Sequence, residues 1–224
     1  DKVKIHAFSY EDDYVDEIDN LDDHARVTAA IRLFDFAEQE IVSGKDSFLS
    51  IPTLLEKCGA KKPMLVCDRS SFDFLFLKDY LDSLSWDFVR FDGFSPNPKY
   101  DEVKEGVELF RQENCDAILS IGGGSAIDTA KNIKMFAVLN PDEVYLKQEL
   151  QYSSIPHIAI PTTAGTGSES THFSVVYYNG EKQSVAQDCM LPDAVVLEPR
   201  LLETLPVYQK KSTLLDAMCQ CIEA

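Results

Sequence analysis

Asp-Ala-Ile-Leu-Ser-Ile-Gly-Gly-Gly-Ser-Ala-Ile-Asp-Thr-Ala-Lys, residues 116–131, is the stretch that decides the fold of this chain. Residues 117–121 form a short, almost wholly apolar run, which is typical of a strand buried on both faces of a parallel sheet. Three glycines follow at residues 122–124, and a helical pattern then continues to Phe136. Glycines let a ligand approach the backbone, and the free N–H groups that begin a helix attract anions. The stretch therefore predicts a phosphate or pyrophosphate cradle; the alternative is a tight turn that needs glycine only for its dihedral angles.

The same alternation of strand and helix extends to both sides of this corner. Strand patterns cover residues 63–68, 86–91, 116–121, 157–161, 172–178 and 194–197, and helical patterns cover residues 48–58, 72–84 and 101–113. Strands that alternate with helices of this length predict an α/β fold with a doubly wound, mostly parallel nucleotide-binding sheet. Ligands of such sheets bind at the carboxyl ends of the strands, where the glycine corner falls.

The two ends of the chain differ in character from this central part. Residues 1–33 are acidic and are interpreted as an N-terminal appendage or the end of a preceding domain, with strand and helix patterns at residues 3–8 and 21–36. From Pro206 the pattern is continuous helix. We therefore expect a dinucleotide-binding domain over residues 34–204 and the truncated start of an all-helical domain, binding metal and substrate, over residues 205–224. Neither end reads as a natural terminus.

The composition limits the classes of partner. A formal net charge of −17 at pH 7 argues against nucleic acid and membrane surfaces, because both present phosphates to a protein. The six cysteines show neither zinc-finger nor CxxC spacing, so that we expect reduced thiols. The sequence has no secretory signal and no long apolar run, which predicts a cytoplasmic protein.

Two further stretches carry residues suited to a nucleotide. Asp68 ends the first buried strand of the unit, where a carboxylate can accept hydrogen bonds from both hydroxyls of an adenosine ribose, although it could equally cap the next helix. It would also repel a 2′-phosphate, which favours NAD(H) over NADP(H), but the neighbouring Arg69 weakens that inference. Residues 161–169, Pro-Thr-Thr-Ala-Gly-Thr-Gly-Ser-Glu, form a hydroxyl-rich loop at another strand end. A surface turn is the alternative, and the nearby glycine corner favours a ligand loop.

A third constellation lies in the C-terminal helical pattern. Asp216 and Gln220 are one helical turn apart and so share a face, from which both could reach one metal ion. A helix-start aspartate is the commoner explanation of Asp216.

Taken together, these motifs resemble the iron-containing (group III) alcohol dehydrogenase family from about residue 34 to the end of the chain. Residues 95–98, Ser-Pro-Asn-Pro, add to the resemblance, and Lys182 and Asp216 lie at the family's distances before and after Pro192. The resemblance implies a nucleotide-binding α/β domain, a helical domain and a divalent metal, iron or zinc, in the cleft between them. It implies hydride transfer between NAD(P)H and a small aldehyde, with the metal polarising the carbonyl group.

The resemblance also implies a role for each matching residue. Asp68 would bind the adenosine ribose, the glycine corner the pyrophosphate, the hydroxyl-rich loop the rest of the dinucleotide and Lys182 its ribose. The candidate cofactor-binding residues are Asp68, Gly123, Gly124, Ser125, Asp128, Thr162, Thr163, Thr166, Ser168 and Lys182.

The implied metal ligands are Asp216 and Gln220, with further ligands expected beyond Ala224. The iron-dependent members usually have His in place of Gln220, and an amide oxygen is a poorer ligand for iron or zinc than imidazole. Relatives such as glycerol dehydrogenase build a site without that His, so Gln220 bears on the identity and affinity of the metal more than on its existence.

The expected substrate is a small aldehyde or alcohol, and we expect a homo-oligomer. Gln220 and residues 16–24, which resemble the closing segment of sugar- or choline-phosphate nucleotidyltransferases, are similar to features of phosphonoacetaldehyde reductase-like relatives. One alternative is a lyase or cyclase of the dehydroquinate synthase type, which shares the fold, NAD and metal. Another is a nucleotide-binding module that has lost its chemistry.

Overall fold

The computed structural model describes residues 6–8, 15–17, 39–73, 75–203 and 205–223. Strands β1 (His6–Phe8) and β2 (Val15–Glu17) pair antiparallel with each other, which agrees in part with the strand expected at residues 3–8. The helix expected at residues 21–36 and most of residues 16–24 lie outside the described residues.

The centre of the fold is a six-stranded sheet in the order β3-β10-β7-β6-β4-β5. Every pairing in it is parallel, so the expected doubly wound α/β sheet is confirmed. The strands are β3 (Glu40–Ser43), β4 (Pro63–Cys67), β5 (Val89–Phe91), β6 (Ala117–Gly122), β7 (His157–Pro161) and β10 (Ala194–Leu197). Strand β3 was not predicted, because Glu-Ile-Val-Ser is a short edge strand that is only half buried.

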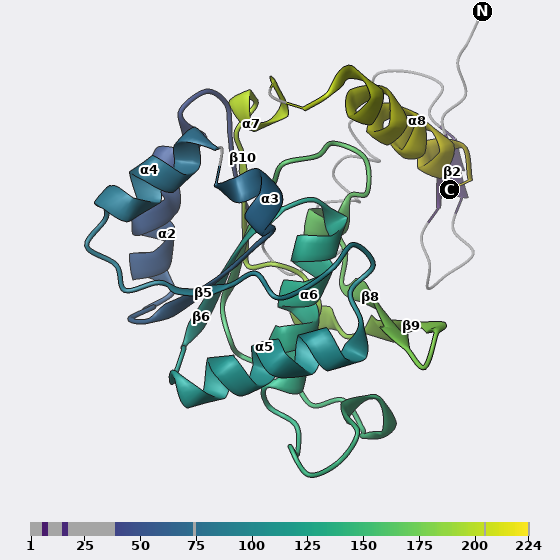
Figure 1. Ribbon diagram of the computed structural model, residues 1–224. Helices are drawn as coiled ribbons and strands as arrows, with labels where there is room; N and C mark the ends of the chain where they lie inside the picture. The colour runs from purple at the N-terminus through teal and green to yellow at the C-terminus, as the bar shows by residue number, and fades with distance from the viewer. Residues whose placement is uncertain (1–5, 9–14, 18–38, 74, 204, 224) are drawn as a thin grey trace, which may run out of the picture.

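Helices cover both faces of this sheet (Figure 1). One face packs against the 3-10 helix η1 (Ser47–Ser50) and helices α2 (Ile51–Lys57), α3 (Arg69–Phe72), α4 (Phe76–Ser83) and α7 (Arg200–Glu203). The other face packs against α5 (Tyr100–Gln112) and α6 (Gly124–Phe136). Alternate residues of β4 serve the two cores: Leu65 and Cys67 point to the first, Met64 and Val66 to the second. Cover on both faces explains why this strand is apolar at every position.

Three elements differ from the sequence expectation. The helix expected at residues 72–84 begins only at Phe76, because Leu75 is extended and caps α4, whereas Phe72 ends the separate short helix α3. The strand at residues 86–91 is shorter, Val89–Phe91. The strand at residues 172–178 exists as β8 (Phe173–Tyr178), but it forms an antiparallel hairpin with β9 (Glu181–Ala186) outside the main sheet. Asn179 and Gly180 both have positive φ, the geometry of a two-residue hairpin turn.

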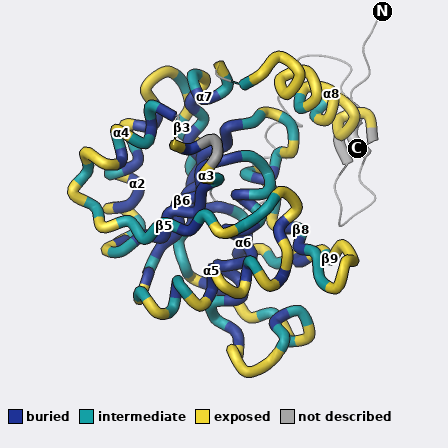
Figure 2. The backbone as a smooth tube through the Cα atoms, in the orientation of Figure 1, coloured by how far each residue is buried: buried dark blue, intermediate teal, exposed yellow. Residues whose placement is uncertain are grey.

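Helix α8 (Val207–Glu223) confirms the helical pattern predicted beyond Pro206. Most of its residues are exposed (Figure 2), including the apolar side chains of Val207, Tyr208, Leu214, Leu215, Met218 and Ile222. The division into domains near residue 204 stays a prediction. Within the described part of the chain, no helix combines the length and the apolar character that crossing a bilayer requires.

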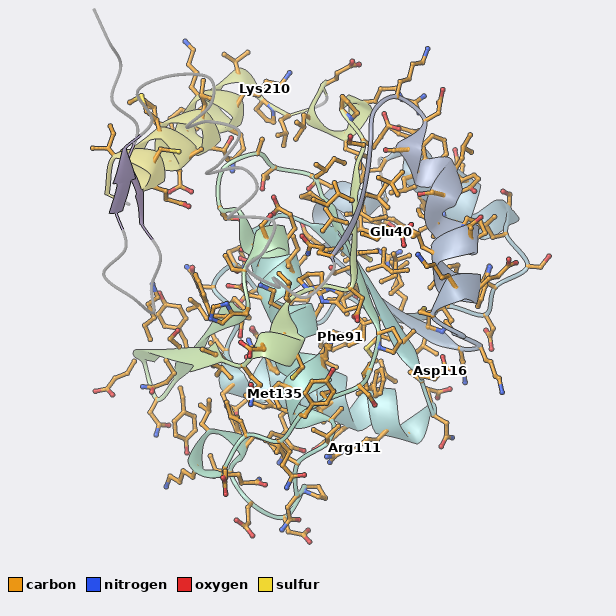
Figure 3. All side chains as sticks on the ribbon, turned by 180° about the vertical axis from the view of Figure 1, so that it is seen from behind. Glu40, Phe91, Arg111, Asp116, Met135 and Lys210 are labelled. Carbon is orange, nitrogen blue, oxygen red and sulfur yellow. The ribbon has the colours of Figure 1, made fainter. Side chains whose placement is uncertain are left out.

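The two ends of the sheet are distinct. At the amino end, the carboxylate of Asp116 accepts hydrogen bonds from the backbone N–H groups of Lys61 and Lys62 at 2.9–3.0 Å. Figure 3 shows Asp116 well away from Lys210, which lies on α8 beyond the carboxyl end.

The three remaining short 3-10 helices, η2 (Tyr145–Lys147), η3 (Ser168–Ser170) and η4 (Asp188–Met190), lie in the loops that connect the strands and helices.

Candidate functional site

The glycine corner lies at the carboxyl end of β6, where the strand turns into α6. Gly122 has φ +155°, and a Cβ there would come within 2.6 Å of the Ala126 Cβ, so only glycine fits without a shift. The Gly122 carbonyl accepts a hydrogen bond of 2.9 Å from the N–H of Thr162, the first threonine after β7. The corner is therefore joined directly to the hydroxyl-rich loop of residues 161–169.

The hydroxyl groups of that loop close around the next two glycines. A Cβ on Gly123 would lie 3.2 Å from the Thr163 Oγ1, and a Cβ on Gly124 would lie 3.1 Å from the Thr166 Oγ1 and 3.2 Å from the Ser168 Oγ. The absence of side chains at both positions thus lets three hydroxyls approach the beginning of a thirteen-residue helix. Hydroxyl donors, backbone N–H groups and the positive end of a helix dipole make this a place that suits an anion.

A third segment, residues 95–98, borders the same corner. The N–H of Asn97 donates a hydrogen bond of 3.2 Å to the Ser125 Oγ, and Asn97 adopts a left-handed conformation at φ 59°. Both the hydroxyl and the N–H of Ser95 donate to the Glu102 carboxylate, which fixes the start of this segment on α5. Three loops that are far apart in sequence therefore meet around the first turn of α6.

Asp128 lies one turn further along α6 and contacts the hairpin. Its Oδ2 accepts a hydrogen bond of 3.2 Å from the N–H of Val175 in β8. Burial raises the pKa of this carboxyl group, against the opposing effect of the nearby charges of Lys131 and Lys182. Lys182 is exposed on β9. The Ser168 hydroxyl also favours the charged form of Asp128, so this carboxylate faces both the hairpin and the hydroxyl-rich loop.

Lys131 and Asn132 continue this contact between α6 and the hairpin, which the sequence analysis did not predict. The Lys131 side chain is 0% exposed, and its Nζ donates hydrogen bonds to the carbonyl and hydroxyl oxygens of Thr171 and to the Phe173 carbonyl at 2.6–2.9 Å. Burial lowers the pKa of this ammonium group from about 10.5 to about 8. Asn132 binds Ser174 and the Val175 carbonyl. The helical spacing 128, 131, 132 on one face of α6 was the available signal.

Asp68 follows β4 directly and lies half-buried at the same end of the sheet. Its backbone carbonyl accepts a hydrogen bond from the N–H of Phe72, so that the chain turns into α3 at this point. The guanidinium group of the next residue, Arg69, forms two hydrogen bonds of 2.9 and 2.7 Å with the carboxylate of Asp92. The cation that weakened the sequence argument for NAD(H) is therefore paired.

Asp216 and Gln220 are both exposed on α8, one helical turn apart as expected. Gln220 Nε2 donates a hydrogen bond of 3.3 Å to the Gly165 carbonyl, and a Cβ on Gly165 would lie 2.6 Å from the carbonyl oxygen of Thr213. Helix α8 is therefore in contact with the hydroxyl-rich loop. No group of three or more His, Cys, Asp or Glu side chains within the described ranges is placed to hold a metal ion. Iron and zinc sites use at least three protein ligands, so these residues alone do not make one.

Two cavities lie away from this site. They have volumes of about 480 and 290 Å³ and are lined by residues that include Gln39 and Asp193 near the amino ends of β3 and β10. Asp193 there accepts hydrogen bonds from the buried Lys134 ammonium and from the N–H of His157. Their walls do not include the glycine corner or the hydroxyl-rich loop, so they do not belong to the candidate site.

Comparison with known proteins identifies relatives of the whole central region. A sequence model of iron-containing alcohol dehydrogenases matches residues 38–199. NAD-dependent methanol dehydrogenase of Bacillus methanolicus is 34% identical over 191 residues, which cover 82% of this chain and 50% of that protein. 1,3-propanediol dehydrogenase of Citrobacter freundii is 32% identical over 208 residues, which cover 86% of this chain and 52% of that protein.

Solved structures give the same result. The crystal structure of sulfoacetaldehyde reductase from Bifidobacterium kashiwanohense in complex with NAD+ superimposes with a TM-score of 0.74 at 28% identity. The match covers 80% of this chain and 49% of the reductase. The chain thus spans about half the length of the relatives it matches.

Proposed function

The chain belongs to the iron-containing alcohol dehydrogenase family, and from this membership we propose that it binds NAD(H) as part of an oxidoreductase acting on a small alcohol or aldehyde. The observation that carries the proposal is the approach of three hydroxyls to Gly123 and Gly124 at the start of α6. The start of α6 thus carries no side chain at either glycine, and hydroxyl groups lie 3.1–3.2 Å from the two Cβ positions, so that donors gather around this backbone. A pyrophosphate has the negative charge that such donors bind, and the family relatives include an NAD-dependent enzyme.

Each residue of the site has a proposed role in holding the dinucleotide. The N–H groups of Gly124 and Ser125 would bind the pyrophosphate, because the first N–H groups of a helix have no partner within it. The Thr162, Thr163, Thr166 and Ser168 hydroxyls would line it. When bound, the nicotinamide supplies or accepts the hydride exchanged with the substrate.

The remaining roles concern the ribose groups and the choice of dinucleotide. Asp68 would accept hydrogen bonds from the adenosine ribose, which supports NAD(H) over NADP(H). Lys182, held near Asp128 by the hairpin, would reach the other ribose. Asp128 would support the site from two sides, since its carboxylate binds the Val175 N–H of the hairpin and interacts with the Ser168 hydroxyl of the loop.

We extend the proposal to a divalent metal, iron or zinc, with Asp216 and Gln220 as two of its ligands. The family name supports iron. The contact of Gln220 with the Gly165 carbonyl keeps this helix face beside the dinucleotide loop, which supports a metal close to the nicotinamide. The other ligands would belong to a region that corresponds to the half of the relatives' length not covered by this chain.

For the substrate we propose a two-carbon aldehyde with an anionic head group, phosphonoacetaldehyde, within the wider class of small aldehydes. The similarity to a sulfoacetaldehyde reductase supports this choice, because a sulfonate and a phosphonate are alike in shape and charge. We also propose a homo-oligomer in the cytoplasm; the six free cysteines fit a reducing compartment.

The test of the activity is NADH oxidation, followed by absorbance, with phosphonoacetaldehyde, sulfoacetaldehyde and propionaldehyde in turn, with and without added Fe²⁺ or Zn²⁺. Net NADH consumption supports an oxidoreductase. A kcat/KM that is higher for phosphonoacetaldehyde than for the other two aldehydes supports phosphonoacetaldehyde as the substrate. Tight NAD+ binding without net consumption would instead favour a dehydroquinate synthase-like enzyme or a binding module.

A further inference from the structure

Two arginines and an aspartate form a cluster at the carboxyl ends of β4 and β5. Val66 in β4 pairs with Phe91 in β5, so the residues that follow, Asp68 and Arg69 on one strand and Asp92 on the other, leave the sheet side by side. This is the end of the sheet at which Asp68 is proposed to meet the adenosine ribose. The cluster therefore borders the part of the dinucleotide that distinguishes NAD(H) from NADP(H).

Asp92 holds both arginines. Arg69 Nε and Nη2 donate to the two oxygens of its carboxylate at 2.9 and 2.7 Å, a bidentate pair. Arg90 Nε lies 3.2 Å from Asp92 Oδ2, in an ion pair without hydrogen-bond geometry, while Arg90 Nη1 donates to Asp73 at 2.7 Å. The Asp92 side chain is only 15% exposed, whereas that of Arg69 is 73% exposed. The exposed Arg69 guanidinium is thus held by the Asp92 carboxylate, which is itself largely buried.

We propose that Asp92 is the positioning residue that sets the preference for NAD(H), by occupying the Arg69 guanidinium that would otherwise bind the 2′-phosphate of NADP(H). The inference rests on the proposed function, in particular on a dinucleotide whose adenosine ribose meets Asp68.

The chemistry of the guanidinium group supports this reading. Arginine presents a planar fork of donors that fits a phosphate as well as a carboxylate, and a nearby arginine is the usual partner of a 2′-phosphate. Here Asp92 takes the Nε–Nη2 edge of the fork and compensates its positive charge, so a 2′-phosphate would meet a guanidinium that is already paired with a carboxylate. Arg69 and Arg90 also carry two positive charges against three negative ones on Asp68, Asp73 and Asp92. These five side chains together carry a net charge of −1, which disfavours a further phosphate beside them.

The test is the variant Asp92→Asn, titrated calorimetrically with NADH and with NADPH. Asparagine keeps the size of the side chain and removes its charge, so Arg69 gains freedom to leave. We expect NADPH to bind about tenfold more tightly than to the unchanged chain, and NADH affinity to change by less than about threefold. The gain should shrink as salt is raised, because it depends on the charge of the phosphate.

Asp73→Asn is the matched control. It removes one carboxylate from the same cluster and leaves the bidentate pair of Arg69 and Asp92 intact. The ratio of the NADH and NADPH dissociation constants should then stay within about threefold of that of the unchanged chain. An equal gain in NADPH affinity in both variants would mean that net charge alone acts, and would overturn the assignment to Asp92.

Replacing Arg69 tests whether its guanidinium is the group that binds the 2′-phosphate in the Asp92→Asn variant. Adding Arg69→Met to Asp92→Asn should abolish the gain in NADPH affinity, and a gain that persists contradicts the proposal. Arg69→Met alone should leave NADPH affinity nearly unchanged, because Asp92 already compensates the charge of the guanidinium; a clear loss would overturn the proposal even if Asp92→Asn did not fold. If the unchanged chain binds neither NADH nor NADPH, the proposed function fails instead.

Discussion

Replacing Gly123 by valine would fill the space in which the pyrophosphate is proposed to lie. The backbone at this position tolerates a side chain, because φ is −79°, an ordinary value for any residue. The nearest atoms to an added Cβ all belong to the Thr163 side chain, at 3.2, 3.3 and 3.9 Å. A threonine side chain can give way, so we expect the fold to persist while the two valine methyl groups exclude the anion.

The size of the effect follows from the hydrogen bonds that would be lost. Each hydrogen bond to a charged group contributes about 1.5–3 kcal/mol. Losing two of those proposed for the pyrophosphate costs at least about 3 kcal/mol, which weakens NADH binding by a factor of about 100 or more. Gly123→Ala should have a smaller effect.

The assay is isothermal titration calorimetry with NADH, alongside circular dichroism and thermal unfolding to establish that each variant is folded. Gly59→Asn is a suitable control, since Gly59 ends α2 away from the corner, has φ +73° and has open space around its Cβ position. Asparagine tolerates this conformation, so NADH binding should be unchanged. A folded Gly123→Val variant that binds NADH with unaltered affinity would refute the cradle.

Three further changes test other parts of the account. Asp68→Ala should weaken NADH binding more than NADPH binding in titrations, and equal losses would contradict its ribose role. Gln220→His should raise Zn²⁺ affinity at least about tenfold in competition titrations, because imidazole is the better ligand, and no gain would argue against a metal beside Asp216. The Lys131 pKa is about 8 in the folded state and about 10.5 when unperturbed. Between these values the unfolded chain binds more protons, so the free energy of unfolding should rise with pH by as much as roughly 3 kcal/mol. Lys131→Met should flatten that rise in denaturant titrations at pH 7.5 and 10, and an identical slope would mean that Lys131 does not titrate there.

The elements that depend on local signals could be predicted from the sequence. The run before Gly122 is apolar at nearly every position because helices cover both faces of the sheet, and this pattern needs no knowledge of distant residues. The glycines themselves marked the corner. The strand at residues 172–178 was instead assigned to the main sheet and its partner β9 was not predicted, although Asn179 and Gly180 form a turn that favours an antiparallel pair.

The contacts that depend on tertiary packing could not be predicted. Lysine is rarely buried, so nothing in the sequence marked Lys131 as a buried donor to three oxygens of the hairpin segment. The pair of Arg69 and Asp92 joins residues 23 positions apart across two strands, and its existence depends on the register of β4 and β5. The helical spacing of Asp216 and Gln220 was evident, whereas the contact of Gln220 with Gly165 depends on where α8 lies.

The central claim is that the corner of β6 and α6 binds a pyridine dinucleotide, and a titration with NADH tests it most directly. Nicotinamide fluorescence and energy transfer from Trp86, the single tryptophan of the chain, report binding, with NADPH titrated in parallel. The account predicts saturable binding that is tighter for NADH than for NADPH and is lost in Gly123→Val. A folded chain that gives no saturable signal with either dinucleotide, or equal binding by the unchanged chain and Gly123→Val, would contradict it.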